Sequence, residues 1–182
     1  MKLYRFSPIK DQEQLIKAIE YTHFACQKLC KQILSKYLPV AGNVGIFCHY
    51  QDEYDLLVKL RDELSDVNDN WNKKYYRLYK PIVIHAKGGV PKTTYTHLYI
   101  RRADPYRAQV GDADFVMNTT IFKPLKESLL EGTKINGIRA FDRPDLDMLE
   151  LHNPDIDVLS YVHTHTMKDN MRIQKISEKT KL

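Results

Sequence analysis

The sequence has too little cysteine for a disulfide framework. Its 182 residues include only 3 cysteines, Cys26, Cys30 and Cys48, and an odd number cannot all pair within one chain. Low cysteine usage is typical of a reducing compartment. These cysteines lie near His23 and His49, so a zinc site is an alternative. Since no CxxC pair is present, we expect the thiols to be core residues instead.

Long hydrophobic runs are also absent. No stretch approaches the roughly 18 apolar residues of a membrane span, and the first residues show no secretory signal. Glycine and proline are scarce, at 7 and 8 residues, which excludes a fibrous chain. We therefore expect one cytoplasmic domain over residues 1–182, without membrane contact and with a frayed polar tail from about residue 168.

The charge balance is mildly basic. The net charge is +5 and the pI is about 9.0, values that are compatible with a nucleotide or nucleic acid partner. The sequence leaves the oligomeric state open.

Hydrophobic periodicity predicts helices first and strands later. Helices are expected over residues 11–38 and 52–64 and again near Pro124, whereas strands are expected between residues 75 and 166 and at 43–50. Trp71, in a polar loop, is expected to cover the core edge. This order predicts an α+β fold with a mostly antiparallel sheet of about five to seven strands, a long N-terminal helix, and one or two further helices packed on the sheet.

The stretch from Thr94 to Asp114 contains the main candidate site. Strict alternation along a strand would place Thr96, Leu98 and Ile100 on a core face. The opposite, polar face would carry Tyr95, His97, Tyr99 and Arg101.

The last predicted strand repeats this pattern, because alternation places Leu159, Tyr161, His163 and His165 on one face. We predict that His97 and either His163 or His165 divide the roles of acid and base in phosphodiester chemistry. The stacking residues would be Tyr95, Tyr99 and Tyr161, and the phosphate-binding residues would be Arg101, Arg102 and Arg107. The alternative is an ordinary solvated sheet face.

Two motifs resemble known catalytic arrangements. His97-Leu98-Tyr99 and His163-Thr164-His165 are similar to the paired His-x-Thr/Ser motifs of two-histidine phosphoesterases, with Tyr and His at the third position. The second motif also resembles the His-hydrophobic-His motif of single-strand nickases, with Thr in the middle. The first resemblance implies phosphodiester hydrolysis, and the second implies a tyrosine nucleophile.

Asp112 and Asp114 lie two residues apart and would share one strand face. Their carboxylates could hold Mg²⁺ or Mn²⁺, although Gly-Asp-Ala-Asp also suits a turn, and we expect no other cofactor. The leading hypothesis is a nucleotide or nucleic acid binding protein, with a histidine-dependent phosphodiesterase or nuclease as its enzymatic version. The alternatives are a non-catalytic RNA-binding module, a protein-interaction domain built on the first helix, and a metalloenzyme.

Overall fold

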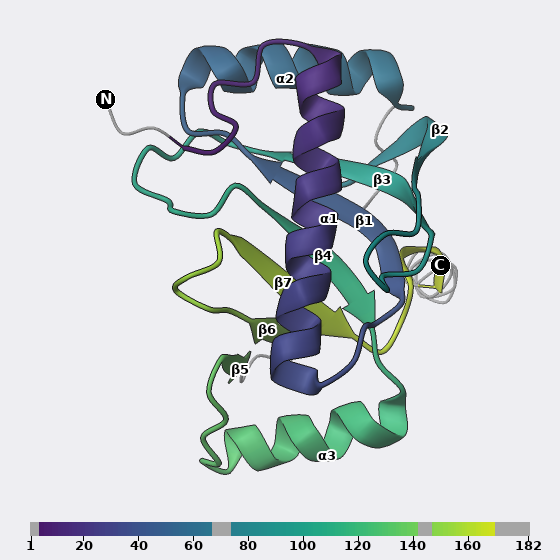
Figure 1. Cartoon of the computed structure of the whole chain (residues 1–182), viewed down its shortest axis with the longest axis vertical. Coiled ribbons are helices and arrows are strands. Elements are labelled where there is room, and N and C mark those ends of the chain that lie inside the picture. The colour runs from purple at the N-terminus through teal and green to yellow at the C-terminus, as the bar shows by residue number, and fades with distance from the viewer. Residues whose placement is uncertain (1–3, 67–73, 142–146, 170–182) are drawn as a thin grey trace, which may run out of the picture.

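The computed structural model describes residues 4–66, 74–141 and 147–169. Trp71 and most of the tail therefore lie outside the described residues. The helices are α1 (Gln12–Leu34), α2 (Gln51–Leu64) and α3 (Thr119–Leu130), and residues 167–169 are also helical. The strands are β1 (Val40–Phe47), β2 (Tyr76–Ile84), β3 (Thr93–Arg101), β4 (Gly111–Val116), β5 (Ile138–Ala140), β6 (Leu149–Leu151) and β7 (Val158–His163). These elements form one sheet with helices around it (Figure 1).

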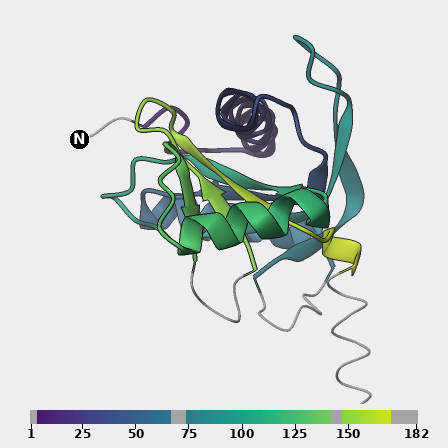
Figure 2. The same cartoon turned by 90° about the horizontal axis from the view of Figure 1, so that it is seen from below.

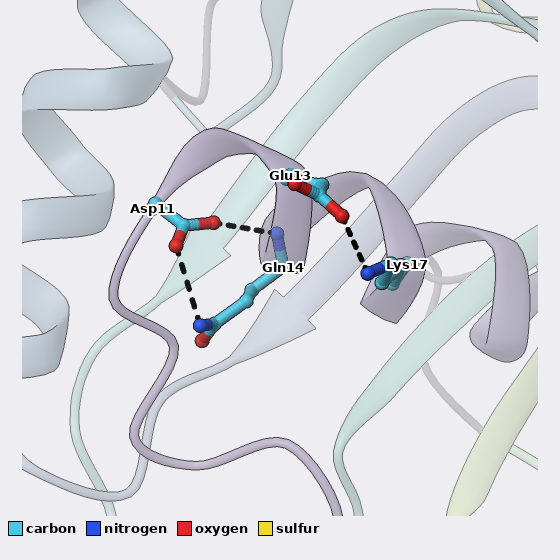
Figure 3. A network of polar contacts seen from close by, with 4 residues as sticks. All are labelled: Asp11, Glu13, Gln14 and Lys17. Carbon is cyan, nitrogen blue, oxygen red and sulfur yellow. Dashed lines mark hydrogen bonds and ion pairs between the residues drawn. The ribbon is translucent and has the colours of Figure 1, made fainter.

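Helix α1 begins at a side-chain cap. The Asp11 carboxylate accepts a hydrogen bond from the Gln14 backbone N–H at 2.8 Å, and Lys17 pairs with Glu13 one turn later at 2.6 Å (Figure 3). Such a cap satisfies a donor that the first helical turn would otherwise leave unpaired. The helix ends where Ser35 adopts the left-handed conformation, at φ 60°.

One face of α1 is completely buried against the sheet. Leu15, Ile19, Cys26 and Leu29 have no exposed surface and recur at helical spacing. The helix crosses β1, β4 and β7, and Figure 2 shows it on one side of the sheet, apart from α2 and α3. The prediction of core cysteines is confirmed, since all three thiols are free and buried.

The sheet has seven strands in the order β2-β3-β1-β4-β7-β6-β5. The α+β class and the long first helix are confirmed, but the prediction of a mostly antiparallel sheet is wrong. Strands β1 and β3 are parallel, as are β4 and β7, so the sheet is mixed. Parallel neighbours require crossover connections, and here α2 with β2 supplies the first, while α3 with β5 and β6 supplies the second. Among the described residues, no helix combines the length and apolarity needed to cross a membrane.

Helix α3 begins earlier than the sequence suggested. Asn118 caps it by accepting from the Thr120 N–H at 2.8 Å, so Pro124 lies beyond the first turn. Gly132, at φ +105°, follows the helix end.

Candidate functional site

The centre of the candidate site is strand β4, which lies beside β1 and β7 in the middle of the sheet. A side chain at Gly111 would collide with Thr22 of α1, so this position faces the helix. Asp112 and Asp114 occupy the alternate positions of β4 and therefore face away from α1. The prediction that the two aspartates share one face agrees with this register. We call the face turned away from α1 the polar face; its central residues are Asn43, Gly45, His97, Tyr99, Asp112, Asp114, Tyr161 and His163.

Asp112 occupies space that a glycine provides. Gly45 of β1 is its direct partner across the strands, and Tyr99 of β3 pairs with Gly45 on the other side. A Cβ atom at Gly45 would lie 2.2 Å from Asp112 Oδ1 and 3.1 Å from the Tyr99 ring. The carboxylate therefore lies over the bare backbone of β1, against an aromatic ring.

Asp114 pairs with the histidine of the last strand. His163 Nε2 lies 3.1 Å from Asp114 Oδ2, and the side chains of His163 and Asp114 are 22% and 8% exposed. The Asn43 amide lies on the other side of Asp114, because Val44 pairs with Ala113. Asp114 thus links β1 and β7 through its side chain.

The two carboxyl groups differ in their acidity. Burial raises the pKa of Asp112 to about 7, and the charge of Asp114 adds to this rise against the opposing effects of Lys74, Arg101 and Arg107. Burial also acts on Asp114, but the charge and hydrogen bond of His163, with the Asn43 amide, hold its pKa below the usual value. A buried pair with separated acidities is typical of functional sites.

Aromatic and basic side chains surround this pair. The rings of Tyr75 and Tyr99 meet edge to face at 5.9 Å, and Lys74 Nζ lies 4.9 and 4.4 Å from their respective centroids. Burial raises the pKa of Tyr75 and of Tyr99, so both phenols are neutral near pH 7. They can therefore donate hydrogen bonds to an anionic ligand.

A hollow of about 480 Å³ opens beside the carboxylates. Leu159 and Tyr161, the neighbours of Asp112 and Asp114 on β7, belong to its lining. Arg101 and Arg107 line it as well, and their guanidinium carbons lie 5.1 and 5.3 Å from the centroid of the Phe47 ring. Its lining also includes the ion pair between Arg139 and Glu150, whose side-chain atoms are 2.5 Å apart.

The two predicted catalytic histidines face the same side of the sheet at different strands. His97 is on β3 and His163 is on β7, with β1 and β4 between them. Three strand spacings correspond to about 14 Å between backbones. His97 is 6% exposed, and its Nδ1 lies 2.9 Å from Thr96 Oγ1. The geometry therefore joins His163 directly to a carboxylate, whereas His97 lies on the far side of Asn43. His165 follows β7 in an exposed bend.

The prediction that Tyr95 belongs to the polar face is wrong. Tyr95 has no exposed surface, and its hydroxyl lies 2.8 Å from His23 Nδ1 on α1, inside the core. The pairing of β2 with β3 shifts register between His97 and Tyr95, and such an irregularity breaks the strict alternation of side chains. Arg102 is exposed beyond the end of β3 and is not among the residues that line the hollow.

Several residues of the site had no sequence signal strong enough to single them out. Asn43 and Gly45 resemble ordinary residues at the start of a strand, and Lys74 and Tyr75 lie at the end of a polar loop. Their importance follows from the pairing of β1 with both β3 and β4, which no local pattern specifies.

A second hollow of about 700 Å³ lies beside the outer surface of α1. It is basic and aromatic: Lys87 Nζ is 5.8 Å from the centroid of Phe24, and Lys31 Nζ is 5.6 Å from that of Tyr37. The turn containing Lys87 is closed by reciprocal backbone hydrogen bonds between Lys87 and Val90.

The polar face can perform two kinds of chemistry. The Asp114–His163 pair can hold and transfer a proton, and the two carboxylates can contribute oxygen ligands to a cation. Within the described part of the chain, no group of three or more His, Cys, Asp or Glu side chains is arranged to hold a metal ion. Any cation here would therefore need further ligands from water or a bound molecule.

Comparisons with models of known protein families, with curated proteins and with solved structures found no match to this chain.

Proposed function

We propose that the protein binds a nucleotide or a single strand of nucleic acid on the polar face, and that phosphodiester hydrolysis is the reaction performed there. The observation that carries the proposal is the meeting of Arg101, Arg107 and Tyr161 in one hollow beside the buried Asp112 and Asp114. Cationic and aromatic groups in a concave site, with acid–base groups beside it, are the combination that a phosphodiester with a base requires.

The guanidinium groups provide the phosphate contacts in this proposal. Arg101 and Arg107 both lie near the Phe47 ring, and their charges favour the ionised form of the neighbouring Asp112 carboxyl. An arginine fork matches the geometry of a phosphate group, and an aromatic ring nearby can stack on a base. Tyr161 lines the same hollow and is the ring that we assign to this stacking.

The acid–base residue in this proposal is His163 rather than a pair of histidines. Its Nε2 atom faces the Asp114 carboxylate, which fixes the orientation of the ring. His163 can then accept a proton from an attacking water or donate one to the leaving oxygen.

Binding of a fluorescent single-stranded oligonucleotide at several salt concentrations tests the site. We expect each of Arg101→Ala and Arg107→Ala to weaken binding by about tenfold and to reduce the salt slope by about one. Arg102→Ala is the matched control, since Arg102 is the exposed neighbour of Arg101 and does not line the hollow. An equal loss in all three variants would reject the hollow as the binding site.

The second hollow provides a competing location. Substitution of Lys28, Lys31 and Lys87 by alanine should leave oligonucleotide binding unchanged if the ligand occupies the polar face. Loss of binding in this triple variant, with full binding in Arg101→Ala, would move the nucleic acid to the α1 surface.

Hydrolysis is tested with His163→Ala. This variant should lose turnover of a phosphodiester substrate while retaining oligonucleotide binding within about threefold, because the ring acts on protons rather than on affinity. Exposed His165 provides the matched control, and His165→Ala should retain full turnover. Unchanged turnover in His163→Ala would reject the enzymatic part of the proposal.

A further inference from the structure

We infer that Asp112 and Asp114 form a binding site for one divalent cation of the Mg²⁺ or Mn²⁺ type, which the phosphate of a bound ligand completes. The second part of this inference rests on the proposed function, whereas binding of the cation alone does not.

The first observation is that each carboxylate has a buried oxygen without a partner. Asp112 and Asp114 are 2% and 6% exposed, and the Oδ1 atom of each has no hydrogen-bond partner among the described residues. Buried polar atoms in folded proteins are nearly always satisfied, so an exception indicates a missing ligand or a functional role. Hard oxygen ligands of this kind are those that Mg²⁺ and Mn²⁺ prefer.

A second and independent observation is the Asn43 side chain. It is 1% exposed, its amide lies beside Asp114 and lowers the pKa of that carboxyl, and within the described residues its amide oxygen has no hydrogen-bond partner. A buried amide oxygen in this state has lost its hydrogen bonds to water without replacement. Its oxygen can accept from a water bound to the cation, and its N–H groups can hold a carboxylate in place.

The third observation is the space at Gly45. The Asp112 Oδ1 atom lies where a side chain of β1 would otherwise be, since a Cβ there would approach it to 2.2 Å. The absence of a side chain at this position allows the Asp112 carboxylate to lie flat against β1. Any larger residue would displace the carboxylate.

Two carboxylates leave most of an octahedral coordination shell to other ligands. Mg²⁺ in proteins commonly keeps several waters and is held by one or two carboxylates together with substrate phosphates. Lys74, Arg101 and Arg107 act on Asp112 from the surrounding positions, where they can bind the remaining phosphate oxygens. This arrangement accounts for the presence of cationic side chains around a site that itself binds a cation.

Binding of Mn²⁺ alone to the full chain, followed by electron paramagnetic resonance of the free ion, tests the inference. We expect one Mn²⁺ per chain, with affinity reduced by about tenfold or more in each of Asp112→Asn and Asp114→Asn. Asp147→Asn is the matched control, because that carboxylate is 62% exposed and pairs with Lys126 away from the site. Gly45→Ala should weaken Mn²⁺ binding without removing either ligand.

The outcomes separate the cation site from the proposed function. Equal Mn²⁺ affinity in the wild-type chain, Asp112→Asn and Asp114→Asn would overturn the cation site, provided that circular dichroism shows the variants folded. Mn²⁺ binding with the expected pattern, in a protein that binds no oligonucleotide at any salt concentration, would retain the cation site and reject the proposed function.

Discussion

Two groups of buried acidic side chains, Glu53 on one hand and Asp112 with Asp114 on the other, have different surroundings. Near the N-terminus of α2, Glu53 is 2% exposed and both of its oxygens accept hydrogen bonds. Oε1 accepts from Ser7 Oγ at 2.8 Å and from the Ile9 N–H at 2.9 Å, and Oε2 accepts from the His49 N–H at 2.8 Å. On the polar face, Asp112 and Asp114 are buried to a similar extent, but each has an oxygen without a partner among the described residues.

This difference separates a structural role from a functional one. A buried carboxylate that accepts several hydrogen bonds stabilises the segments that donate them, and Glu53 joins the N-terminal segment to α2 in this way. A buried carboxylate without such donors destabilises the fold, because its charge has lost the solvation of water. We attribute the first cluster to folding and the second to ligand binding.

The largest expected effect on stability is at Glu53, whose two oxygens both accept hydrogen bonds. Glu53→Gln replaces one accepting oxygen by a donor and leaves buried N–H or O–H groups unpaired, so we expect a loss of about 4 kcal/mol in the free energy of unfolding. Urea denaturation at pH 7 measures it. A loss below about 1 kcal/mol would remove the distinction between the two clusters.

The next largest effect on stability comes from a buried histidine, and it depends on pH. Burial lowers the pKa of His23 to about 4, and its Nδ1 faces the Tyr95 hydroxyl. Because the unfolded chain binds this proton near pH 6.5, the stability that neutral His23 contributes is complete above pH 6.5. It falls by about 3 kcal/mol as the pH decreases towards 4.

His23→Gln removes the titrating group and serves as the reference for this effect. The difference in the free energy of unfolding between wild type and variant should decrease steadily between pH 6.5 and 4.5. A difference that does not change with pH would show that His23 is charged or solvated in the folded chain.

Substitution of Asp112, which has an oxygen without a partner among the described residues, should stabilise the protein rather than destabilise it. The folded-state pKa of Asp112 is about 7, above the ordinary value of 3.8, so the folded chain must bury a charge only as the pH rises through 7. We expect Asp112→Asn to stabilise the protein by about 2 kcal/mol at pH 8, and this gain should vanish as the pH falls towards 4. Denaturation at pH 8 and pH 5, without divalent cations, measures both values. Destabilisation at pH 8 would assign Asp112 a structural role.

The smallest effect concerns Ser7. Its hydroxyl donates to Glu53 and accepts from His49 Nδ1, which lies 2.6 Å away, so the His49 tautomer carries its proton on Nδ1. We expect Ser7→Ala to cost about 1 kcal/mol, because two other donors still satisfy Glu53. A loss as large as that of Glu53→Gln would mean that Ser7, rather than the carboxylate, organises the cluster. Urea denaturation at pH 7 measures the free energy of unfolding of both variants, Ser7→Ala and Glu53→Gln.

The sequence predicted which side chains share one face of a strand better than it predicted how neighbouring strands pair. Alternation correctly placed Tyr99 and Arg101 on a face opposite Leu98, and it placed Tyr161 and His163 opposite Val162. It failed at Tyr95, because a register shift against β2 turns that ring into the core. Such shifts depend on the partner strand and leave no local pattern.

The arrangement of the site could not be predicted because it depends on long-range pairing. Asp112 lies over Gly45 only because β1 and β4 are adjacent, although more than sixty residues separate them along the chain. The parallel pairs follow from crossovers through α2 and α3, whereas the order of helices first and strands later favoured an antiparallel sheet. Asn43, which lies beside Asp114, could be recognised only once its neighbours on β4 were known.

The most direct measurement is anomalous diffraction from a crystal of the protein grown with Mn²⁺. The account predicts a single strong peak between the Oδ1 atoms of Asp112 and Asp114, within reach of the Asn43 amide. A map with no peak at these atoms, from a crystal grown in the same Mn²⁺ solution, would contradict this prediction.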